Sequence, residues 1–410
     1  MTKPIILLAT VGASPQVVTE TLYAIHQQQL GWPSELRIIT TTFGAQKVRQ
    51  GLLEQGHLQR LCHELGDLPV PAFADHEDYL RIVPDAEGNP VDDARTRADH
   101  EALADFIVKE VQAATANEQQ RVHASLAGGR KTMTFYLGYA MSLFGRADDV
   151  LSHVLISEGF EGHPDFWFPT QAPDYKTITN RAKQLDASSA EVLLTTIPFI
   201  THRHELPTLL QNSELQQSFN EIVGLINLAE APEKIYLEID KPKRSVYLYS
   251  TDDKQKLLAS FEFNLLEFTF YLMVAEATIE QRVEIFRPGA KGSASLFTLY
   301  LTSLKQLLKI DASIPQDLVF KRLEDAGISS TTLKVWQESS SIKPGWFDDR
   351  NNKIQQAFKQ QLPERLAKRI TPRSMFSDIG ESIFLDIDYT YKNGGYGIPL
   401  PQPGMQIKVF

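Results

Sequence analysis

Two cations directly follow a pair of glycines in the stretch Ser125–Thr134, which reads SLAGGRKTMT. The apolar-alternating run Arg121–Leu126 predicts a strand before the glycines, and the spacing of apolar residues over Met133–Phe144 predicts a helix after them. A glycine turn at this place leaves backbone N–H groups free beside the positive end of the helix dipole. Together with Arg130 and Lys131, the turn predicts an anion site, most often a phosphate site. The alternative interpretation is an ordinary helix start with two solvated cations.

The stretch departs from two common phosphate-binding motifs. A Walker A loop would need glycines where Ser125 and Arg130 stand. The dinucleotide fingerprint would need a different spacing of glycines, because Arg-Lys-Thr fills its second gap. Neither of these two classes of nucleotide site is therefore expected.

A second strand–turn–helix junction lies at residues 10–16, which read TVGASPQ. The continuous apolar run before it, Pro4–Thr10, is typical of a strand that is buried on both faces. Ser14 suits the N-cap of the following helix and Pro15 suits its first position. A well-capped helix start explains these two residues, but it does not explain the other polar residues that gather there.

Strands and helices alternate through the first half of the chain. We expect further strands at Leu36–Phe43, which ends in three threonines, and at Val150–Ser157, with helices at Ala45–Leu65 and Thr96–Ala114 and an acidic loop over Asp75–Ala94. This order predicts an α/β fold, Rossmann-like, with a mostly parallel sheet. Ligands of such sheets bind at the carboxyl ends of strands, so both glycine tips and the threonine cluster are expected at one edge.

Three segments, in order along the chain, resemble the CARF-domain accessory proteins of type III CRISPR systems. They are Thr10–Leu22 (TVGASPQVVTETL), Ser125–Thr134 and Gly145–Leu155 (GRADDVLSHVL). Within that family, residues 4 to 170 are most similar to the CRISPR-associated ring nucleases of the Csm type. The resemblance implies a homodimer that takes part in antiviral defence. It also implies binding of a cyclic oligoadenylate second messenger across the dimer axis, with cyclic tetra-adenylate preferred to cyclic hexa-adenylate.

The residue pattern and the resemblance together predict the site. The expected ligand-binding residues are Thr10, Gly12, Ser14, Gln16, Thr41, Thr42, Ala127, Gly128, Gly129, Arg130, Lys131 and Thr132. Catalytic roles are expected for Lys131, Arg130 and Ser14. No metal and no cofactor is expected, because a ribose 2′-OH that attacks its own phosphate needs alignment and charge stabilisation only. The tips contain no evident histidine or carboxylate pair, so turnover is expected to be slow.

The second half of the chain predicts a separate α+β domain. We expect a CARF-like domain over residues 1–205, a helical linker over 206–231 and the second domain over 232–410. The expected elements of the second domain are strands at Tyr236–Glu238 and Val246–Tyr249, helices at Phe263–Ala277, Leu296–Leu308 and Asp348–Gln361, and a terminal strand pair at Tyr389–Gly397 and Ile398–Val409. This order resembles the winged-helix domain of OmpR-like response regulators.

A basic stretch makes DNA a second candidate partner. From Lys343 to Arg373 the chain has 8 Lys and Arg against 3 Asp and Glu, a local charge of +5. The alternative function is therefore a transcriptional regulator controlled by cyclic oligoadenylate, without cleavage. The alternative without a partner is that the stretch is a solvated helix face. A third option for the second half is a dimerisation or docking module.

Composition limits these options. The 410 residues carry a net charge of −10, so general nucleic-acid binding is not expected and any such role must be local. The single cysteine, Cys62, excludes a disulfide framework and fits a reducing cytosol. No signal peptide or membrane span is evident, so a cytoplasmic protein without a membrane partner is expected. The last histidine is His204, so the second half cannot hold the Arg–His motif of a HEPN ribonuclease.

Overall fold

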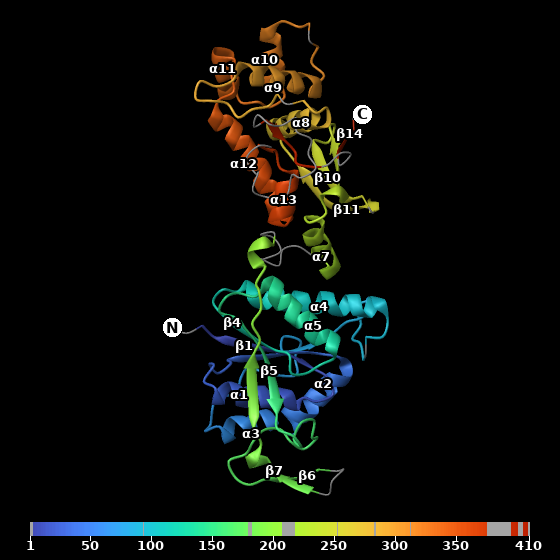
Figure 1. Cartoon of the computed structure of the whole chain (residues 1–410), viewed down its shortest axis with the longest axis vertical. Helices are drawn as coiled ribbons and strands as arrows, with labels where there is room; N and C mark the ends of the chain where they lie inside the picture. Colours follow the sequence, from blue (N-terminus) through green and yellow to red (C-terminus); the bar gives the residue numbers. More distant parts are fainter. Residues whose placement is uncertain are drawn as a thin grey trace. The chain divides into compact units, whose positions relative to one another are not determined.

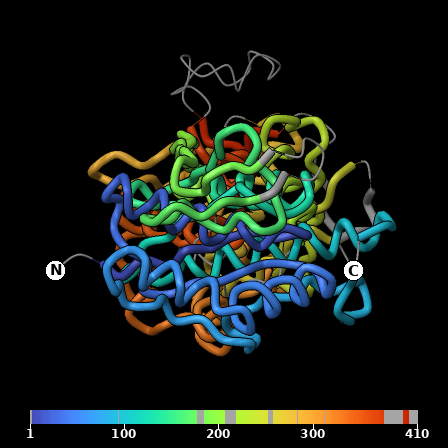
Figure 2. Tube along the Cα trace, turned by 90° about the horizontal axis from the view of Figure 1, so that it is seen from below, coloured from blue at the N-terminus to red at the C-terminus, as the bar shows by residue number. Residues whose placement is uncertain are grey.

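The computed structural model describes residues 3–92, 94–178, 183–206, 218–251, 253–282, 284–311, 313–374, 395–400 and 405–408, which are the coloured parts of the trace in Figure 2. The chain divides into two compact units, Met1–Asn220 and Glu221–Phe410. This division lies within the segment 206–231 that was expected as a linker. Each unit has its own hydrophobic core.

The first unit is built on a six-stranded sheet with the strand order β3-β2-β1-β4-β5-β8. Neighbouring strands are parallel, except that β8 runs antiparallel to β5. The predicted α/β class with a mostly parallel sheet is therefore confirmed. The strands are β1 (Ile5–Val11), β2 (Glu35–Thr40), β3 (Leu80–Ile82), β4 (Arg121–Ser125), β5 (Val150–Ile156) and β8 (Val192–Thr196), and a separate antiparallel pair is formed by β6 (Tyr175–Ile178) and β7 (Lys183–Asp186).

Helices cover both faces of this sheet, with α4 and α5 on one face and α1, α2 and α3 on the other (Figure 1). Because of this double cover, every residue of β1 is buried, as its continuous apolar sequence predicted. The helices are α1 (Gln16–Gln27), α2 (Thr42–Val48), the π-helix η1 (Arg49–Glu54), α3 (His57–Glu64), α4 (Arg97–Ala116) and α5 (Lys131–Phe144), with short 3-10 turns η2 (Ala187–Ser189) and η3 (Arg203–Glu205).

Three expected boundaries in this unit were wrong. The strand predicted to end at Phe43 ends at Thr40, because Thr41 caps α2 by accepting a hydrogen bond from the Gly44 amide. The single helix expected over Ala45–Leu65 is divided into α2, η1 and α3. The acidic loop contains β3, the edge strand that pairs with β2.

The second unit contains a four-stranded sheet with the order β11-β10-β9-β14. The two predicted strands correspond to β9 and β10, which pair as an antiparallel hairpin, and β14 pairs with β9 in the parallel sense. The strands are β9 (Ile235–Asp240), β10 (Ser245–Ser250), β11 (Asp253–Glu262) and β14 (Met405–Lys408), and a second small sheet pairs β12 (Arg373–Ser374) with β13 (Tyr396–Gly397).

The helices of the second unit include all three that the sequence predicted, as α8, α9 and α12. Further helices, α10, α11 and α13, are present, so the order is richer than the winged-helix pattern. The bounds are α7 (Phe219–Leu228, which crosses the division between the units), η4 (Pro232–Lys234), α8 (Leu265–Ile279), α9 (Ala294–Leu307), α10 (Gln316–Asp325), α11 (Ser330–Ser339), α12 (Pro344–Gln361) and α13 (Glu364–Ile370).

The expected terminal strand pair is not formed by the strands that the structure describes. Of that segment, β13 pairs with β12 and β14 pairs with β9, so they belong to different sheets. The rest of the predicted pair lies partly outside the described residues. Among the helices of the described residues, none is long and apolar enough to span a membrane.

Candidate functional site

The strand order reverses between β1 and β4, the two central strands of the first sheet. After β1 the chain continues to β2, which pairs with β1 on one side. After β4 it continues to β5, which pairs with β4 on the other side, and all four strands are parallel. The loops that leave the carboxyl ends of β1 and β4 are the two glycine tips. They therefore lie side by side at the switch point, where open parallel sheets bind ligands.

The two tips contact each other through a hydrogen bond from a side chain to the backbone and through close packing at the glycines. Thr10, fully buried at the end of β1, donates a 2.6 Å hydrogen bond from its hydroxyl to the carbonyl oxygen of Gly128. A Cβ on Gly128 would lie 2.7 Å from the Thr10 carbonyl oxygen and 2.7 Å from Cγ2 of Val17, so only glycine fits there. Gly129 has φ +92°, a left-handed conformation that favours glycine. The glycine pair thus serves close packing of one tip on the other.

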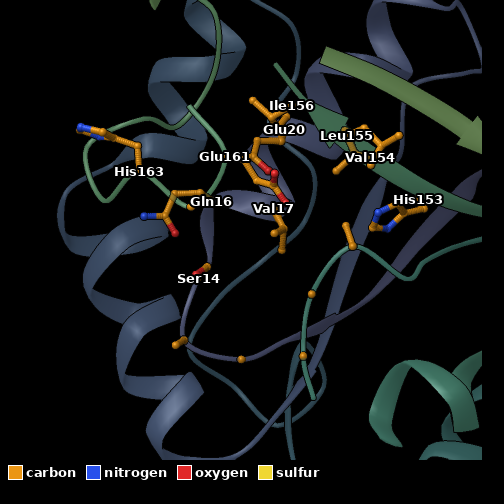
Figure 3. Close-up of a pocket in the computed structure, with 16 residues that line it drawn as sticks. Ser14, Gln16, Val17, Glu20, His153, Val154, Leu155, Ile156, Glu161 and His163 are labelled. Carbon is orange, nitrogen blue, oxygen red and sulfur yellow. The ribbon is translucent and has the colours of Figure 1, made fainter. Parts of the chain in front are cut away.

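A cavity of about 390 Å³ opens beside these tips. It is lined by the loop after β1 and the start of α1, by the loop after β4, and by β5 with the loop that follows it (Figure 3). Its volume lies in the range of about 300–1,000 Å³ that small-molecule sites occupy. The cavity is large enough for one nucleotide.

Half of the predicted ligand-binding residues line this cavity. They are Gly12, Ser14, Gln16, Ala127, Gly128 and Gly129. Ser14 is exposed, and its hydroxyl makes no hydrogen bond to any residue that the structure describes. The helix starts at Gln16 with Pro15 at the N-cap position and no side-chain cap. The predicted capping role of Ser14 was therefore wrong, and its hydroxyl faces the cavity instead.

The other six predicted residues do not line the cavity. Thr10 lies beneath it, where it holds the Gly128 loop. Thr41 and Thr42 belong to the start of α2, where Thr41 acts as the cap. Arg130, Lys131 and Thr132 start α5, with both cations exposed to solvent.

Four polar residues of the cavity were missed by the sequence interpretation. They are Glu20, His153, Glu161 and His163. Glu20 stands one helical turn after Gln16, and this i, i+4 spacing is the signal that could have found it. The other three come from β5 and the loop after it, which has no glycine–cation signature. The site therefore contains a histidine and a carboxylate pair, although the two tips themselves contain neither.

Glu20 is the most perturbed of these groups. Its side chain is buried, and burial, with a smaller contribution from the charge of Glu161, raises its pKa to about 8. Figure 3 shows the Glu20 and Glu161 side chains meeting above Val17, whereas the ring of His163 points away from them. Glu20 is therefore mostly protonated at neutral pH and offers a neutral carboxyl group to the cavity.

The Gln16 side chain is fixed by a hydrogen bond to the loop after β5, which lines the opposite side of the cavity. Its Nε2 donates a 2.9 Å hydrogen bond to the carbonyl oxygen of Pro164, in the loop after β5. Its Oε1 is buried and has no hydrogen-bond partner. This acceptor is one of the few buried polar atoms of the described residues that lack a partner, so its environment calls for an explanation.

No metal centre is present in the part of the chain that the structure describes, since no three His, Cys, Asp or Glu side chains there gather closely enough to hold an ion. His202 and His204 flank Arg203, whose Nη1 donates a 2.9 Å hydrogen bond to the Phe144 carbonyl oxygen. The site can thus bind and orient a ligand through backbone groups, hydroxyls and carboxyls.

The basic stretch of the second unit is largely paired with acids. Its ion pairs, within the described residues, are Arg350 with Glu267 and Asp349, Lys353 with Asp349, Lys359 and Lys368 with Glu364, and Arg365 with Glu230. Two of these acids, Glu267 and Glu230, lie outside the stretch, so its charge of +5 overstates the free positive charge of this surface. DNA binding by this stretch stays a prediction.

Two comparisons with known proteins bear on the chain. The family model described as CRISPR-associated protein NE0113 (Cas_NE0113) matches residues 14–227, just over half of the sequence. The matched range begins within the first glycine tip, at Ser14, and includes the second tip, most of the cavity lining and the whole first sheet except β1. No curated protein matches the chain. The CRISPR association that the three sequence segments predicted is confirmed.

Proposed function

Because this chain belongs to the CRISPR-associated protein NE0113 family, we propose that it binds cyclic oligoadenylate at the carboxyl edge of its first sheet and slowly cleaves the ring. The observation that carries the proposal is the pairing of the two glycine tips at the switch point, beside a cavity of about 390 Å³. Open backbone amides beside the start of α5 suit a phosphate, and the cavity suits the nucleoside attached to it.

The cleavage that we propose needs no water and no metal. The ring's own 2′-oxygen forms a bond to the adjacent phosphorus, and the bond from phosphorus to the 5′-oxygen breaks. The 2′-hydroxyl loses its proton and the departing 5′-oxygen gains one, so the products carry a 2′,3′-cyclic phosphate and a 5′-hydroxyl. Ser14 and the glycine amides align this attack, and Lys131 and Arg130 at the start of α5 stabilise charge on the phosphate oxygens.

A complete ring exceeds one cavity of this size, so the proposal includes a homodimer in which two copies of the site share one ring. Light scattering of the full chain, with and without cyclic tetra-adenylate, measures the oligomeric state. A monomer under both conditions would remove the shared-ring part of the proposal.

Binding and cleavage are tested separately. Calorimetric titration with cyclic tetra-adenylate and cyclic hexa-adenylate measures binding, and the tetra-adenylate is expected to bind more tightly. Incubation of each ring with excess protein in EDTA, followed by chromatography, detects the 2′,3′-cyclic phosphate products. Intact rings after prolonged incubation would remove the catalytic claim, and absence of heat with both rings would remove the binding claim.

A further inference from the structure

Two polar side chains that line the cavity, those of Glu20 and Gln16, have oxygen atoms without a hydrogen-bond partner among the described residues. The Glu20 side chain is 5% exposed and lines the cavity, and its carboxyl group makes no hydrogen bond to the described residues. One turn earlier on the same helix, Oε1 of Gln16 is buried and unpartnered. Glu20 lines the cavity, and polar groups inside proteins are nearly always hydrogen-bonded, so a ligand is expected to satisfy its carboxyl group.

We propose that Glu20 recognises an adenine base, with its protonated carboxyl group paired to the base edge that carries a ring nitrogen and the N6 amino group. A protonated carboxyl group has one O–H donor and one acceptor oxygen. Adenine presents N7 as an acceptor beside N6–H₂ as a donor, so the two edges are complementary. An ionised carboxylate has acceptors only and could serve the amino group alone.

This inference rests on the proposed function and assigns the two ends of its cavity. The glycine tips, with Gly12 and Gly128, form the end that suits phosphate. The helix side, with Glu20 and Gln16, forms the end that suits the base. Val17 lies below Glu20 in Figure 3, and its Cγ2 would be 2.7 Å from a Cβ on Gly128 at the other end. One nucleotide would thus span the cavity from its backbone amides to its buried carboxyl group.

The electrostatic surroundings favour the protonated form of Glu20. Burial and the neighbouring charge of Glu161 hold its pKa at about 8. Helix α1 packs on β1 and β8, which have no ionisable side chain, on β5, which brings His153, and on α3. The ionisable residues of α3 are His57, Arg60, Cys62, His63 and Glu64. His163, from the same loop as Glu161, turns its ring away (Figure 3).

The test compares three forms of the full chain by calorimetric titration with cyclic tetra-adenylate at pH 6, 7, 8 and 9. Wild-type affinity is expected to stay level to pH 7 and to fall above about pH 8, approaching tenfold per pH unit, as Glu20 ionises. Glu20→Gln keeps one donor and one acceptor, so it should bind like wild type at pH 7 and remain level to pH 9. Glu20→Leu removes both groups and should weaken binding at least tenfold at every pH.

Each outcome decides between the claims. Glu87→Gln, on an exposed loop of the same unit, is the matched control and should follow the wild-type pH profile. Wild-type binding that does not change with pH, or a pH profile that Glu20→Gln shares with wild type, would overturn the inference and leave the proposed function standing. Absence of wild-type binding to the ring would overturn both. Should Glu20→Leu fail to fold, the comparison of wild type with Glu20→Gln decides alone.

Discussion

The hydroxyl of Thr10 donates a hydrogen bond of 2.6 Å to the carbonyl oxygen of Gly128, a residue 118 positions later in the chain. Thr10 is fully buried at the end of β1, and Gly128 belongs to the loop after β4. This side chain therefore joins the two glycine tips, in addition to the close packing of Gly128 on Thr10 and Val17. The amides that we propose to bind phosphate depend on this contact.

We predict that Thr10→Val weakens ring binding and destabilises the first unit. Valine has nearly the same shape but cannot donate, so the Gly128 carbonyl loses its partner, at a cost of about 1–3 kcal/mol. Ring binding should weaken severalfold, because the loop after β4 is no longer held. Calorimetry measures the affinity and denaturant unfolding measures the free energy of unfolding.

Thr115→Val is the matched control for this change. Thr115 is also fully buried, but it lies on α4 and donates to the Val111 carbonyl oxygen of its own helix. This variant should lose stability without losing affinity. Equal affinities for Thr10→Val and wild type would show that the contact between the tips does not support the binding site.

We predict that Lys131 is needed for binding and cleavage of the cyclic oligoadenylate ring but not for folding. It is the first residue of α5, it is exposed, and it follows the glycine pair. A hydrogen bond to a charged group contributes roughly 1.5–3 kcal/mol, and a dimer would present Lys131 twice. Lys131→Ala should therefore weaken ring binding at least tenfold and abolish cleavage, with an almost unchanged thermal midpoint.

The control for that prediction is Lys109→Ala, which removes an exposed lysine from α4 of the same unit. It should leave both the affinity and the cleavage unchanged. Wild-type affinity and wild-type cleavage in Lys131→Ala would mean that this lysine is a solvated surface residue, and that the cavity binds its ligand without help from the start of α5.

Glu20 should make the stability of the first unit depend on pH. Its pKa rises from 4.5 to about 8 on folding, so its ionisation favours the unfolded chain. Wild type should lose stability from this group as the pH rises from about 4.5 to about 8, and no more above that. Glu20→Gln cannot ionise, so it should match wild type near pH 4 and exceed it by a few kcal/mol at pH 9.

Denaturant unfolding at a series of pH values measures this difference, and Glu87→Gln again provides an exposed control. A constant difference between Glu20→Gln and wild type from pH 4 to pH 9 would contradict the raised pKa. It would then favour a Glu20 that is ionised and solvated at neutral pH.

The frame of the site was predictable because its signals are local in the sequence. The continuous apolar run of β1 and the glycine pair before α5 each reflect a nearby physical requirement, namely burial on both faces and a left-handed or closely packed backbone. Their convergence followed from the rule that parallel strands end at one edge. Half of the predicted binding residues accordingly line the cavity.

Features that depend on contacts between distant parts of the sequence were not predictable in the same way. The pKa of Glu20 depends on burial beneath neighbouring elements and on Glu161, which stands 141 positions later and carries no motif. Thr41 looked like a strand end because threonine favours strands, but its hydroxyl caps α2. In the second unit, β14 pairs with β9 and not with β13, the strand before it in the chain. Local strand patterns do not determine such long-range pairing.

In the second unit, we predict that the pair of Arg350 and Glu267 is far more important for stability than the other ion pairs of the basic stretch. Glu267 is 3% exposed, the two side chains are 2.9 Å apart, and the guanidinium lies 5.2 Å from the ring centre of Trp346. Arg350→Met leaves a buried carboxylate whose remaining cationic neighbour among the described residues is Lys353, at 3.8 Å. The free energy of unfolding should fall by about 3–5 kcal/mol.

Arg365→Met is the matched control, because Arg365 pairs with Glu230 at 2.8 Å but both side chains are more than half exposed. Its effect on the free energy of unfolding should stay below about 1 kcal/mol. Adding Glu267→Leu to Arg350→Met removes the buried charge and should restore much of the lost stability, since apolar replacements of buried pairs are often neutral. Equal costs for Arg350→Met and Arg365→Met would mean that Arg350 is solvated and free to meet DNA phosphates, which would revive the regulator hypothesis for the second unit.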